Sequence, residues 1–210
     1  MSSSRVEHTQ NKILDAANRL LLDRGFHGVG MESVAVAAGV SRQTVYDRFQ
    51  NKGGLLRAMV ARSEEAAELP LRLQQVVAQT DARRTLMVFL DTLAAVEPLV
   101  YPFSRLVYAA RIEDPTAAEL WEWRIMARYM GLSMVVSRLA AEGRLREGVT
   151  TEEATDIAWA LTSPHQYEYL VIGRGWSIEQ YRAHLERTVT ALLLRPRRGA
   201  KKRAGDESSL

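Results

Sequence analysis

The 210-residue sequence contains no cysteine, which excludes disulfides, thiolate metal sites and thiol nucleophiles. Its four histidines, His8, His27, His165 and His184, show no paired spacing such as i, i+4, so no metal site is expected. A phosphate-cradling glycine loop and a nucleophile–base pair are missing as well. We therefore expect a protein that is not an enzyme and that uses no cofactor.

Long apolar segments are a second absence. Residues 1–7 are polar and lack the apolar stretch of a signal peptide. No apolar run is expected to approach membrane-spanning length. These absences predict a cytoplasmic protein without a membrane partner.

Positive charge is concentrated at the carboxy-terminal end. The formal net charge is +3, while residues 195–210 hold six Lys or Arg against two Asp or Glu. This segment therefore carries +4 and the remainder of the chain −1, so a basic face over the whole protein is not indicated. The segment either attracts nucleic-acid phosphates or forms a solvated, disordered terminus.

Apolar residues recur at helical spacing along most of the chain, and strand-like alternation bounded by hairpin turns is absent. The sequence therefore predicts an all-α fold of about nine helices. Pro70 is expected to interrupt or bend the fourth of them, and Pro98 to end the helix that Asp81 caps. Asp114-Pro115 is a typical helix start. The expected helical segments are, approximately, 7–24, 31–38, 42–49, 52 onward, 81–96, 101–110, 115–142, 151–172 and 177–194.

Residues 31–49 form two short predicted helices joined by a glycine turn, which are the proportions of a helix-turn-helix. Gly39 permits the reversal of the chain, and Ser41 is a good N-cap for the second helix. At about 100° per residue, Val45 and Phe49 share the inner side of that helix. The opposite arc carries Arg42, Gln43, Thr44, Tyr46 and Asp47.

This outer arc suits the major groove of duplex DNA, where base edges differ in their donor and acceptor patterns. Arg42 can fork onto guanine, and Gln43 can pair with adenine. The hydroxyls of Thr44 and Tyr46 can donate to phosphates, and Lys52, just past the helix, can neutralise another phosphate. Ser41, at the cap of the helix, is a further candidate DNA contact. The alternative is an ordinary helical corner with a solvated polar face.

The first quarter of the chain carries a longer ordered pattern. It consists of Ile13-Leu-Asp-Ala-Ala, Leu20, Gly25-Phe26, Val34-Ala35, Ala38-Gly39-Val40-Ser41, Thr44-Val45-Tyr46, Phe49, Asn51-Lys52 and Leu55-Leu56. This pattern resembles the TetR family of transcriptional regulators. The resemblance implies an all-α homodimer whose carboxy-terminal body binds a small molecule and thereby lowers operator affinity. It also places the family's recognition positions on Arg42, Gln43, Thr44, Tyr46 and Asp47, and its phosphate-binding lysine on Lys52.

Two positions depart from the family pattern. Gly30 stands where the family usually has Thr or Ser, so the cap of the first motif helix lacks a hydroxyl that caps well and contacts phosphate. Gly53 stands where an acidic residue is usual, and Gly53-Gly54 open the fourth helix. Because glycine is unfavourable inside a helix, this soft start either loosens the coupling between the DNA-binding segment and the body or has no effect.

Methionine and aromatic residues gather in the body, the part of the chain beyond residue 56. They indicate either ordinary core packing or a pocket between helices for an apolar or aromatic effector. His165, beside Pro164, is either a polar anchor in such a pocket or a hydrogen-bonded structural histidine. The candidate pocket residues are Tyr101, Trp121, Met126, Tyr129, Met130 and His165.

The last two long helices carry apolar stripes that either fill the core of the chain or form the homodimer interface that the resemblance implies. Dimerisation would set two recognition helices about 34–36 Å apart, the spacing of successive major grooves. The candidate interface residues are Trp159, Leu161, Tyr169, Leu185, Val189 and Leu192.

These features predict four segments: a disordered amino terminus (1–6), a helix-turn-helix DNA-binding domain (7–56), a helical ligand-binding and dimerisation domain (57–195) and a disordered basic tail (196–210). The predicted function is that of a sequence-specific transcriptional repressor. A small apolar or aromatic ligand would release it from a palindromic operator in double-stranded DNA. An activator with the same fold and a less specific architectural DNA-binding protein are the alternatives.

Overall fold

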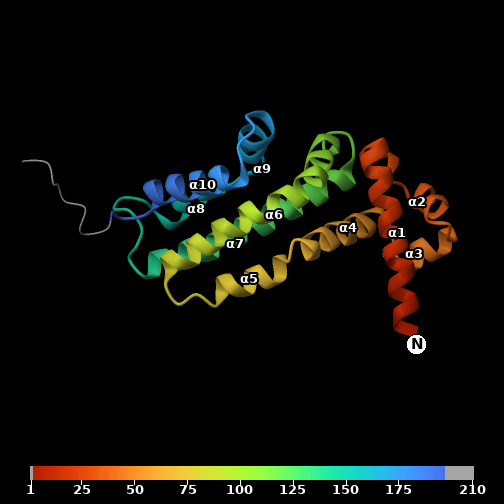
Figure 1. Ribbon diagram of the computed structural model, residues 1–210, viewed down its shortest axis with the longest axis horizontal. Helices are drawn as coiled ribbons and strands as arrows, with labels where there is room; N and C mark the ends of the chain where they lie inside the picture. Colours follow the sequence, from red (N-terminus) through yellow and green to blue (C-terminus); the bar gives the residue numbers. More distant parts are fainter. Residues whose placement is uncertain (1, 197–210) are drawn as a thin grey trace, which may run out of the picture. The chain divides into compact units, whose positions relative to one another are not determined.

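The structure is a computed structural model that describes residues 2–196 (Figure 1). Within that range the chain is helical, and its β structure is one isolated antiparallel bridge between Leu145 and Leu194. The all-α prediction is confirmed, whereas the predicted basic tail lies outside the described residues from residue 197 on. The elements are α1 (Ser2–Arg24), η1 (Phe26–Gly28), α2 (Met31–Ala38), α3 (Arg42–Phe49), α4 (Lys52–Ala66), α5 (Leu69–Val77), α6 (Ala82–Ala110), α7 (Pro115–Ala141), α8 (Thr151–Leu161), α9 (Pro164–Tyr167), η2 (Glu168–Gly173) and α10 (Ile178–Leu193).

The chain divides into two compact units, and α6 and α7 contribute residues to both. Unit 1 combines Met1–Val77 with Thr92–Arg128, and unit 2 combines Ala78–Asp91 with Tyr129–Leu210. The predicted DNA-binding segment thus belongs to a larger unit that also includes α5, the later part of α6 and the first part of α7.

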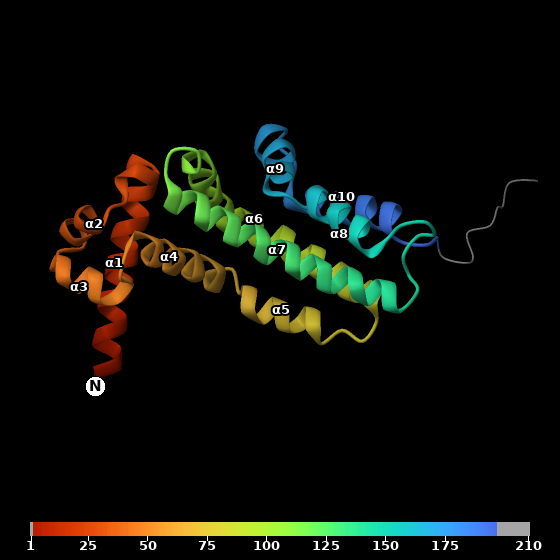
Figure 2. The ribbon, with the colours of Figure 1, turned by 180° about the vertical axis from the view of Figure 1, so that it is seen from behind.

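One hydrophobic core joins the helix-turn-helix to the rest of unit 1. Ile13 of α1, Val34 of α2 and Val45 of α3 are fully buried in it. Val107 of α6 and Leu120 of α7 belong to the same cluster of buried residues. Both ribbon views show α2 and α3 side by side next to α1 (Figures 1 and 2). The predicted DNA-binding segment therefore shares its core with the body, and burying these apolar side chains together stabilises the unit.

The first helix is longer than predicted. α1 begins at Ser2, so residues 2–6, which we expected to be disordered, are helical. The helix ends at Arg24, as predicted, and Gly25 follows with a φ of 70°, a backbone conformation that glycine adopts without strain. The buried apolar positions of α1 begin at Ile13, so its first turns lie outside the periodic pattern that identifies helices in a sequence.

The sixth helix passes through two prolines. Pro98 and Pro102 lie inside α6, so the prediction that Pro98 ends a helix near residue 96 is wrong. Val96 and Val100 are buried on either side of Pro98. Apolar packing therefore continues across the proline and offsets the backbone hydrogen bond that it cannot donate.

The same helix is long and apolar enough, by length and composition, to cross a membrane. An 18-residue window of α6 reaches a mean hydropathy of 1.5, and 56% of that window is buried inside the structure. The expectation that no apolar run approaches membrane-spanning length is therefore wrong for α6. Because more than half of the window is buried, its apolar side chains behave as those of a core helix.

Unit 2 packs α8 and α10 around buried aliphatic side chains. Ala158 of α8 is fully buried, as are Val189 of α10 and Leu139 of α7. α10 begins at the predicted capping box, in which Ser177 Oγ accepts from the backbone N–H of Gln180 at 3.2 Å and the Gln180 side chain accepts in return from Ser177 N–H at 2.8 Å.

The helix predicted over 151–172 is broken. α8 ends at Leu161, and Pro164 opens the short helix α9, which η2 continues as a π-helical turn. Buried Thr162 donates its hydroxyl to the carbonyl oxygen of Ala158 at 2.8 Å, which satisfies an acceptor at the end of α8. Proline has no N–H and favours the first turn of a helix, so it starts a new one here instead of bending the old one.

Candidate nucleic-acid interface

The turn between α2 and α3 is built by two local interactions. Gly39 ends α2 in the left-handed conformation, with a φ of 60°. Ser41 then caps α3, because its Oγ accepts a hydrogen bond from the backbone N–H of Thr44 at 3.0 Å. Both features were predicted, and together they fix the start of the recognition helix.

The recognition helix α3 has a buried side and an exposed side. Val45 is fully buried and Phe49 is 6% exposed, so these two side chains brace the helix from behind. Arg42, Gln43 and Asp47 are exposed, as predicted for residues that face solvent or DNA. Among the remaining predicted contacts, Ser41 and Tyr46 are exposed and Thr44 is half-buried.

Arg42 is held loosely at the start of α3. Its guanidinium lies 3.7 Å from Glu32, across a pair in which both side chains are mostly exposed. It also lies 5.7 Å from the centre of the Tyr46 ring. The Tyr46 side chain, and then Glu32, raise the pKa of Arg42, which therefore stays charged. Exposed ion pairs of this kind contribute little free energy, so the guanidinium remains available for a guanine base edge.

Hydrogen bonds connect neighbouring side chains on the exposed side of α3. The Gln43 amide donates to Asp47 Oδ1 at 2.6 Å. The hydroxyls of Ser41 and Thr44 lie 2.7 Å apart. Each pair is thus pre-oriented, and Asp47 adds a carboxylate that can accept from the amino group of a cytosine base.

Lys52, the predicted phosphate contact, is engaged inside unit 1. Its ammonium nitrogen is 3.0 Å from Asp114 Oδ2 and 4.1 Å from the centre of the Phe26 ring. The Lys52 side chain is only 24% exposed. A DNA phosphate that binds Lys52 would therefore have to compete with the carboxylate of Asp114.

Asp114 joins this ion pair to the start of α7. Its Oδ1 accepts from the backbone N–H groups of Thr116 and Ala117 at 2.8 and 3.2 Å, which caps the helix as predicted. Burial by itself raises the pKa of Asp114, but the hydrogen bonds from Lys52, Ala117 and Thr116 outweigh it, and the pKa lies below its ordinary value. The carboxylate is therefore ionised at neutral pH.

The three glycines at the starts of α2 and α4 have different surroundings. At the cap of α2, Gly30 has no side chain to accept a hydrogen bond, yet its own N–H donates to Ser33 Oγ at 3.0 Å. At the start of α4, a Cβ on Gly54 would overlap the carbonyl oxygen of Phe49. Gly54 therefore permits the close approach of α4 to the end of α3, whereas Gly53 has more room.

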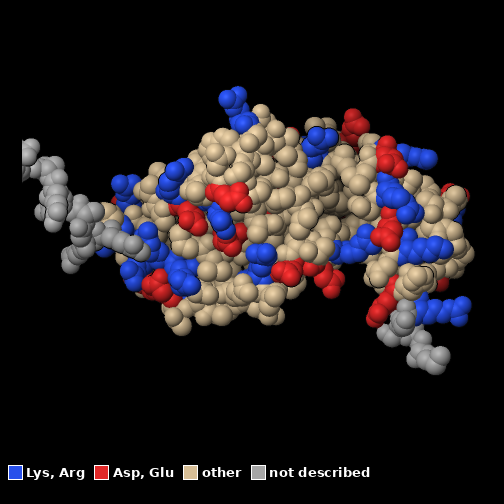
Figure 3. Space-filling view, in the orientation of Figure 1, with Lys and Arg blue, Asp and Glu red and all other residues tan. Residues whose placement is uncertain are grey.

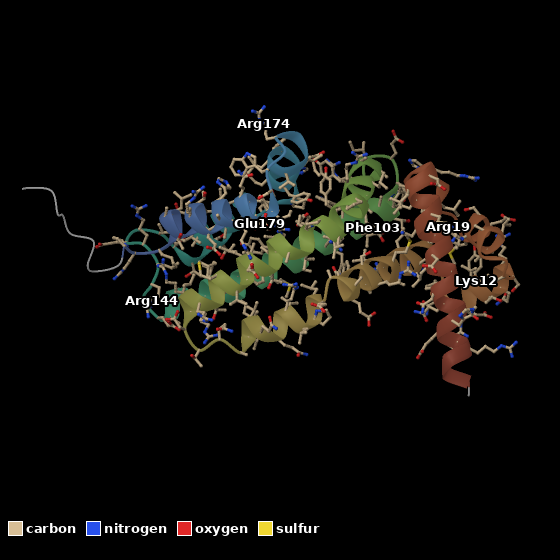
Figure 4. The ribbon with its side chains drawn as sticks, viewed as in Figure 1. Lys12, Arg19, Phe103, Arg144, Arg174 and Glu179 are labelled. Atoms are coloured by element: carbon tan, nitrogen blue, oxygen red, sulfur yellow. The ribbon has the colours of Figure 1, made fainter. Side chains whose placement is uncertain are left out.

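Several basic residues near the motif escaped the sequence reasoning. Arg48 is exposed in the last turn of α3. Lys12 of α1 lies beside the turn, with its ammonium nitrogen 3.6 Å from the position that a Cβ on Gly39 would take. Arg5, Lys12 and Arg19 are exposed and spaced by seven residues, which places them on one face of α1. Figure 4 labels Lys12 and Arg19 on this helix. The spacing of seven residues between these basic side chains is the feature of the sequence that could have identified them.

The candidate pocket residues are distributed over both units. In unit 1, Tyr101 is 7% exposed, Trp121 is half-buried against the core, and Met126 is 58% exposed. In unit 2, Tyr129 donates its hydroxyl to Asp156 at 3.1 Å, Met130 is 64% exposed, and His165 lies 3.8 Å from Glu168. The exposed methionines are the members that contribute least to the core.

A buried ion pair in unit 1 was not foreseen. Arg128 of α7 lies 3.3 Å from Glu97 of α6, and the two side chains are 13% and 5% exposed. Glu97 Oε1 and Arg128 Nε are buried and have no hydrogen-bond partner among the described residues. The periodicity of apolar residues does not predict a charged pair between helices. The two residues are 31 positions apart in the sequence, so no short-range pattern connects them either.

The candidate interface residues of unit 2 fall into two groups. Leu185 and Val189 are buried inside the chain, at 1% and 0% exposure. Tyr169 and Leu192 are exposed, at 69% and 42%, and Trp159 and Leu161 are half-buried. The exposed group is therefore the part that a second subunit can reach. Metal-binding groups of three or more His, Asp or Glu are absent from the described residues.

Comparison with known proteins identifies the amino-terminal segment. Residues 13–59 match the family model described as bacterial regulatory proteins of the tetR family. An uncharacterised HTH-type transcriptional regulator of Mycobacterium tuberculosis is 36% identical over 98 residues, which are 46% of this chain and 48% of the relative. The HTH-type transcriptional activator FasR of Mycolicibacterium smegmatis is 32% identical over 80 residues, 38% of this chain and 36% of the relative. The matched segments thus span about half of these relatives or less.

Solved structures share the fold over nearly the whole chain. NalD of Pseudomonas aeruginosa, the secondary repressor of the MexAB-OprM multidrug efflux pump, matches with a TM-score of 0.69 at 23% identity, covering 92% of this chain and 99% of NalD. A transcriptional regulator of Saccharomonospora viridis in complex with choline matches with a TM-score of 0.67 at 20% identity, covering 90% and 100%. The amino-terminal segment thus resembles that of bacterial regulatory proteins of the tetR family, and the chain shares its all-α fold with NalD and the Saccharomonospora viridis regulator.

Proposed function

We propose that this chain is a transcriptional regulator that binds a specific site in double-stranded DNA through α3. The observation that carries the proposal is the two-sided character of this helix. Val45 and Phe49 anchor its inner side in the core of unit 1, while Arg42, Gln43 and Asp47 project from its outer side. A helix that is rigidly braced and polar outside can enter the major groove and read base edges.

The proposed contacts divide into two kinds. Arg42, Gln43 and Asp47 read bases, through guanine, adenine or cytosine edges. Hydroxyl and basic groups around them bind phosphates and set the position of the helix. These phosphate-binding residues are Ser41, Thr44, Tyr46, Lys52 and, in addition to the sequence prediction, Lys12 and Arg48.

We propose a homodimer as the DNA-binding form. Two copies of α3 about 34–36 Å apart would enter successive major grooves, so the operator would be palindromic. Tyr169 and Leu192 of unit 2 are large apolar side chains exposed to solvent, and burying them against a second subunit would be favourable. Leu185 and Val189 would support this surface from within the core.

We propose that the regulator is a cytoplasmic repressor, without enzymatic activity, that a small molecule releases from its operator. NalD, which shares the fold, is a repressor, and the Saccharomonospora viridis regulator was crystallised with choline. An apolar or aromatic effector would match the aromatic residues Tyr101 and Trp121 of unit 1.

Selection of genomic fragments by the purified protein tests the proposal. We expect recovery of a palindromic site, protected in a footprint as two half-sites about one helical turn apart. Uniform protection of any duplex would instead indicate an architectural DNA-binding protein, and no protection at all would contradict the proposal.

An activator is the second candidate, because one of the matched relatives, FasR, is a transcriptional activator. Transcription from the recovered promoter separates the two functions. Added protein would lower transcript yield for a repressor and raise it for an activator. A screen of apolar cations and aromatic compounds for release of the operator then tests the effector class, and operator affinity that no compound changes would count against ligand control.

A further inference from the structure

A groove on unit 2 gathers four arginines. It has a volume of about 420 Å³ and is lined by Arg83 of α6, Arg187 of α10, and Arg146 and Arg195 of the segments that follow α7 and α10. No carboxylate lines it among the described residues. We call this feature the arginine groove. In Figure 3, Lys and Arg side chains gather around the carboxy-terminal end of α10.

Backbone contacts hold two of these arginines in place. Arg195 Nε donates to the carbonyl oxygen of Leu145 at 2.8 Å, and Arg146 Nη1 donates to the carbonyl oxygen of Ala191 at 3.1 Å. The isolated bridge between Leu145 and Leu194 fixes the same two segments against each other. Both guanidinium groups are thus oriented by neutral partners. Because they are already held in place, binding an anion costs less side-chain entropy.

The other two arginines lack an ion-pair partner in the described part of the chain. Neither Arg83 nor Arg187 lies within ion-pair distance of a described carboxylate. Outside the groove, by contrast, Arg144 pairs with Asp81 at 3.3 Å and Arg182 pairs with Asp91 at 2.7 Å. Four like charges around one groove repel each other, so an anion that entered it would relieve the repulsion.

We propose that the arginine groove binds a small molecule that carries a diphosphate or triphosphate group. Arginine presents a planar fork of donors that matches phosphate oxygens, and several such forks suit a multiply charged anion. The volume lies in the range of small-molecule sites. Leu194 and Pro196 add an apolar part to the lining, against which the carbon portion of the ligand can pack.

This site is separate from the proposed DNA contacts, because its residues belong to unit 2 and α3 belongs to unit 1. None of the candidate residues of the effector pocket lines the groove. Anion binding at the groove can therefore be tested without DNA, and a failure of operator binding would not contradict the proposal.

Isothermal titration of the full-length protein with sodium pyrophosphate, in the absence of DNA and at low salt, tests the proposal. The test variant is Arg187→Ala, and the matched control is Arg174→Ala. Arg174, which Figure 4 labels, is an exposed arginine of unit 2 that does not line the groove. We expect saturable binding that Arg187→Ala weakens by about ten-fold or more, since hydrogen bonds to charged groups are strong, while Arg174→Ala leaves it unchanged. Arg146→Ala provides a second variant should Arg187→Ala fold poorly.

Further titrations identify the kind of ligand. ADP that binds more tightly than pyrophosphate would show that the apolar lining contributes and would support a nucleotide, whereas equal affinities would support a phosphate-only ligand. Pyrophosphate binding that is absent, or that both alanine variants weaken equally, would overturn the proposal. So would binding of random duplex DNA that Arg187→Ala abolishes while pyrophosphate does not bind.

Discussion

In the proposed DNA complex, Arg42 is the residue on which base reading would depend most directly. We expect Arg42→Ala to cost about 1–3 kcal/mol of binding free energy at the cognate base and to relax specificity there, because its guanidinium is exposed and only loosely paired with Glu32. Fluorescence anisotropy with operator variants measures this discrimination. Glu32→Ala is the control, since it removes the pair and keeps the arginine. Unchanged discrimination in Arg42→Ala would refute the assignment.

Gly54 is expected to be essential for the packing of α4 against α3. A Cβ at this position meets the carbonyl oxygen of Phe49, so Gly54→Ala should lower the free energy of unfolding by about 1–3 kcal/mol. Gly53→Ala is the matched control. Its Cβ would lie 3.2 Å from Asn51 Oδ1, and the gain in helix propensity offsets part of this crowding. Urea unfolding compares the two, and equal losses would contradict the close-approach argument.

At this scale the sequence predicted local chemistry well and tertiary contact poorly. The cap at Ser41 and the left-handed glycine at Gly39 follow from neighbouring residues, so they could be predicted. The partner of Lys52 could not, because Asp114 is 62 residues away and only the fold brings the two together. The same limit applies to Gly54, whose role depends on a backbone that passes close by.

The ion pair between Lys52 and Asp114 ties α4 to α7. Asp114→Asn should lower the free energy of unfolding by roughly 1–2 kcal/mol at pH 7, because it removes a hydrogen bond between charged groups yet leaves a side chain that can still cap α7. It should also raise DNA affinity, since Lys52 would then be free to bind phosphate. Urea unfolding and salt titrations of DNA binding measure the two effects.

The pH dependence of this pair has a definite sign. The pKa of Asp114 is lower in the folded chain than in the unfolded one, so the pair stabilises the fold above the ordinary aspartate pKa of about 4. This contribution is lost as the pH falls through the lowered pKa of the folded state. The stability difference between the unmutated chain and Asp114→Asn should therefore shrink below about pH 4. A difference that stayed constant into strong acid would show that the charge is not the cause.

Element boundaries were predictable where a single residue determines them. Asp114-Pro115 and Ser177 mark the starts of α7 and α10, because capping is local. Pro98 misled the prediction because apolar packing holds α6 together on both sides of it. Pro164 did the reverse and began a new helix after Thr162 had closed α8.

The assembly of two chains can be tested at the surface of unit 2. We expect Tyr169→Arg to weaken dimerisation by at least roughly ten-fold, because it places a charge where a 69%-exposed aromatic ring would be buried by a second subunit. Sedimentation velocity measures the dimer. The control is Ile112→Arg in unit 1, an 81%-exposed side chain outside the proposed interface. Equal behaviour of the two variants would rule out this surface.

For the molecule as a whole, only the fold class could be predicted from the sequence. Helical periodicity indicated an all-α chain, and the motif indicated a DNA-binding segment. The two units could not be foreseen, because α6 and α7 each contribute to both. The arginine groove was equally hidden, since Arg83, Arg146, Arg187 and Arg195 are scattered along the sequence and no spacing rule connects them.

The shared core of unit 1 limits how parts of this chain can be combined with other proteins. A fragment cut after residue 56 would strip Phe103, Val107 and Leu120 from the cluster that surrounds Ile13 and Val34. Such a fragment would expose a hydrophobic surface and tend to aggregate. Fusing the amino-terminal helices of this chain to another protein would therefore also require residues 92–128. Because the two parts of unit 1 are separated in the sequence, exchange of the amino-terminal segment alone would disrupt their shared core.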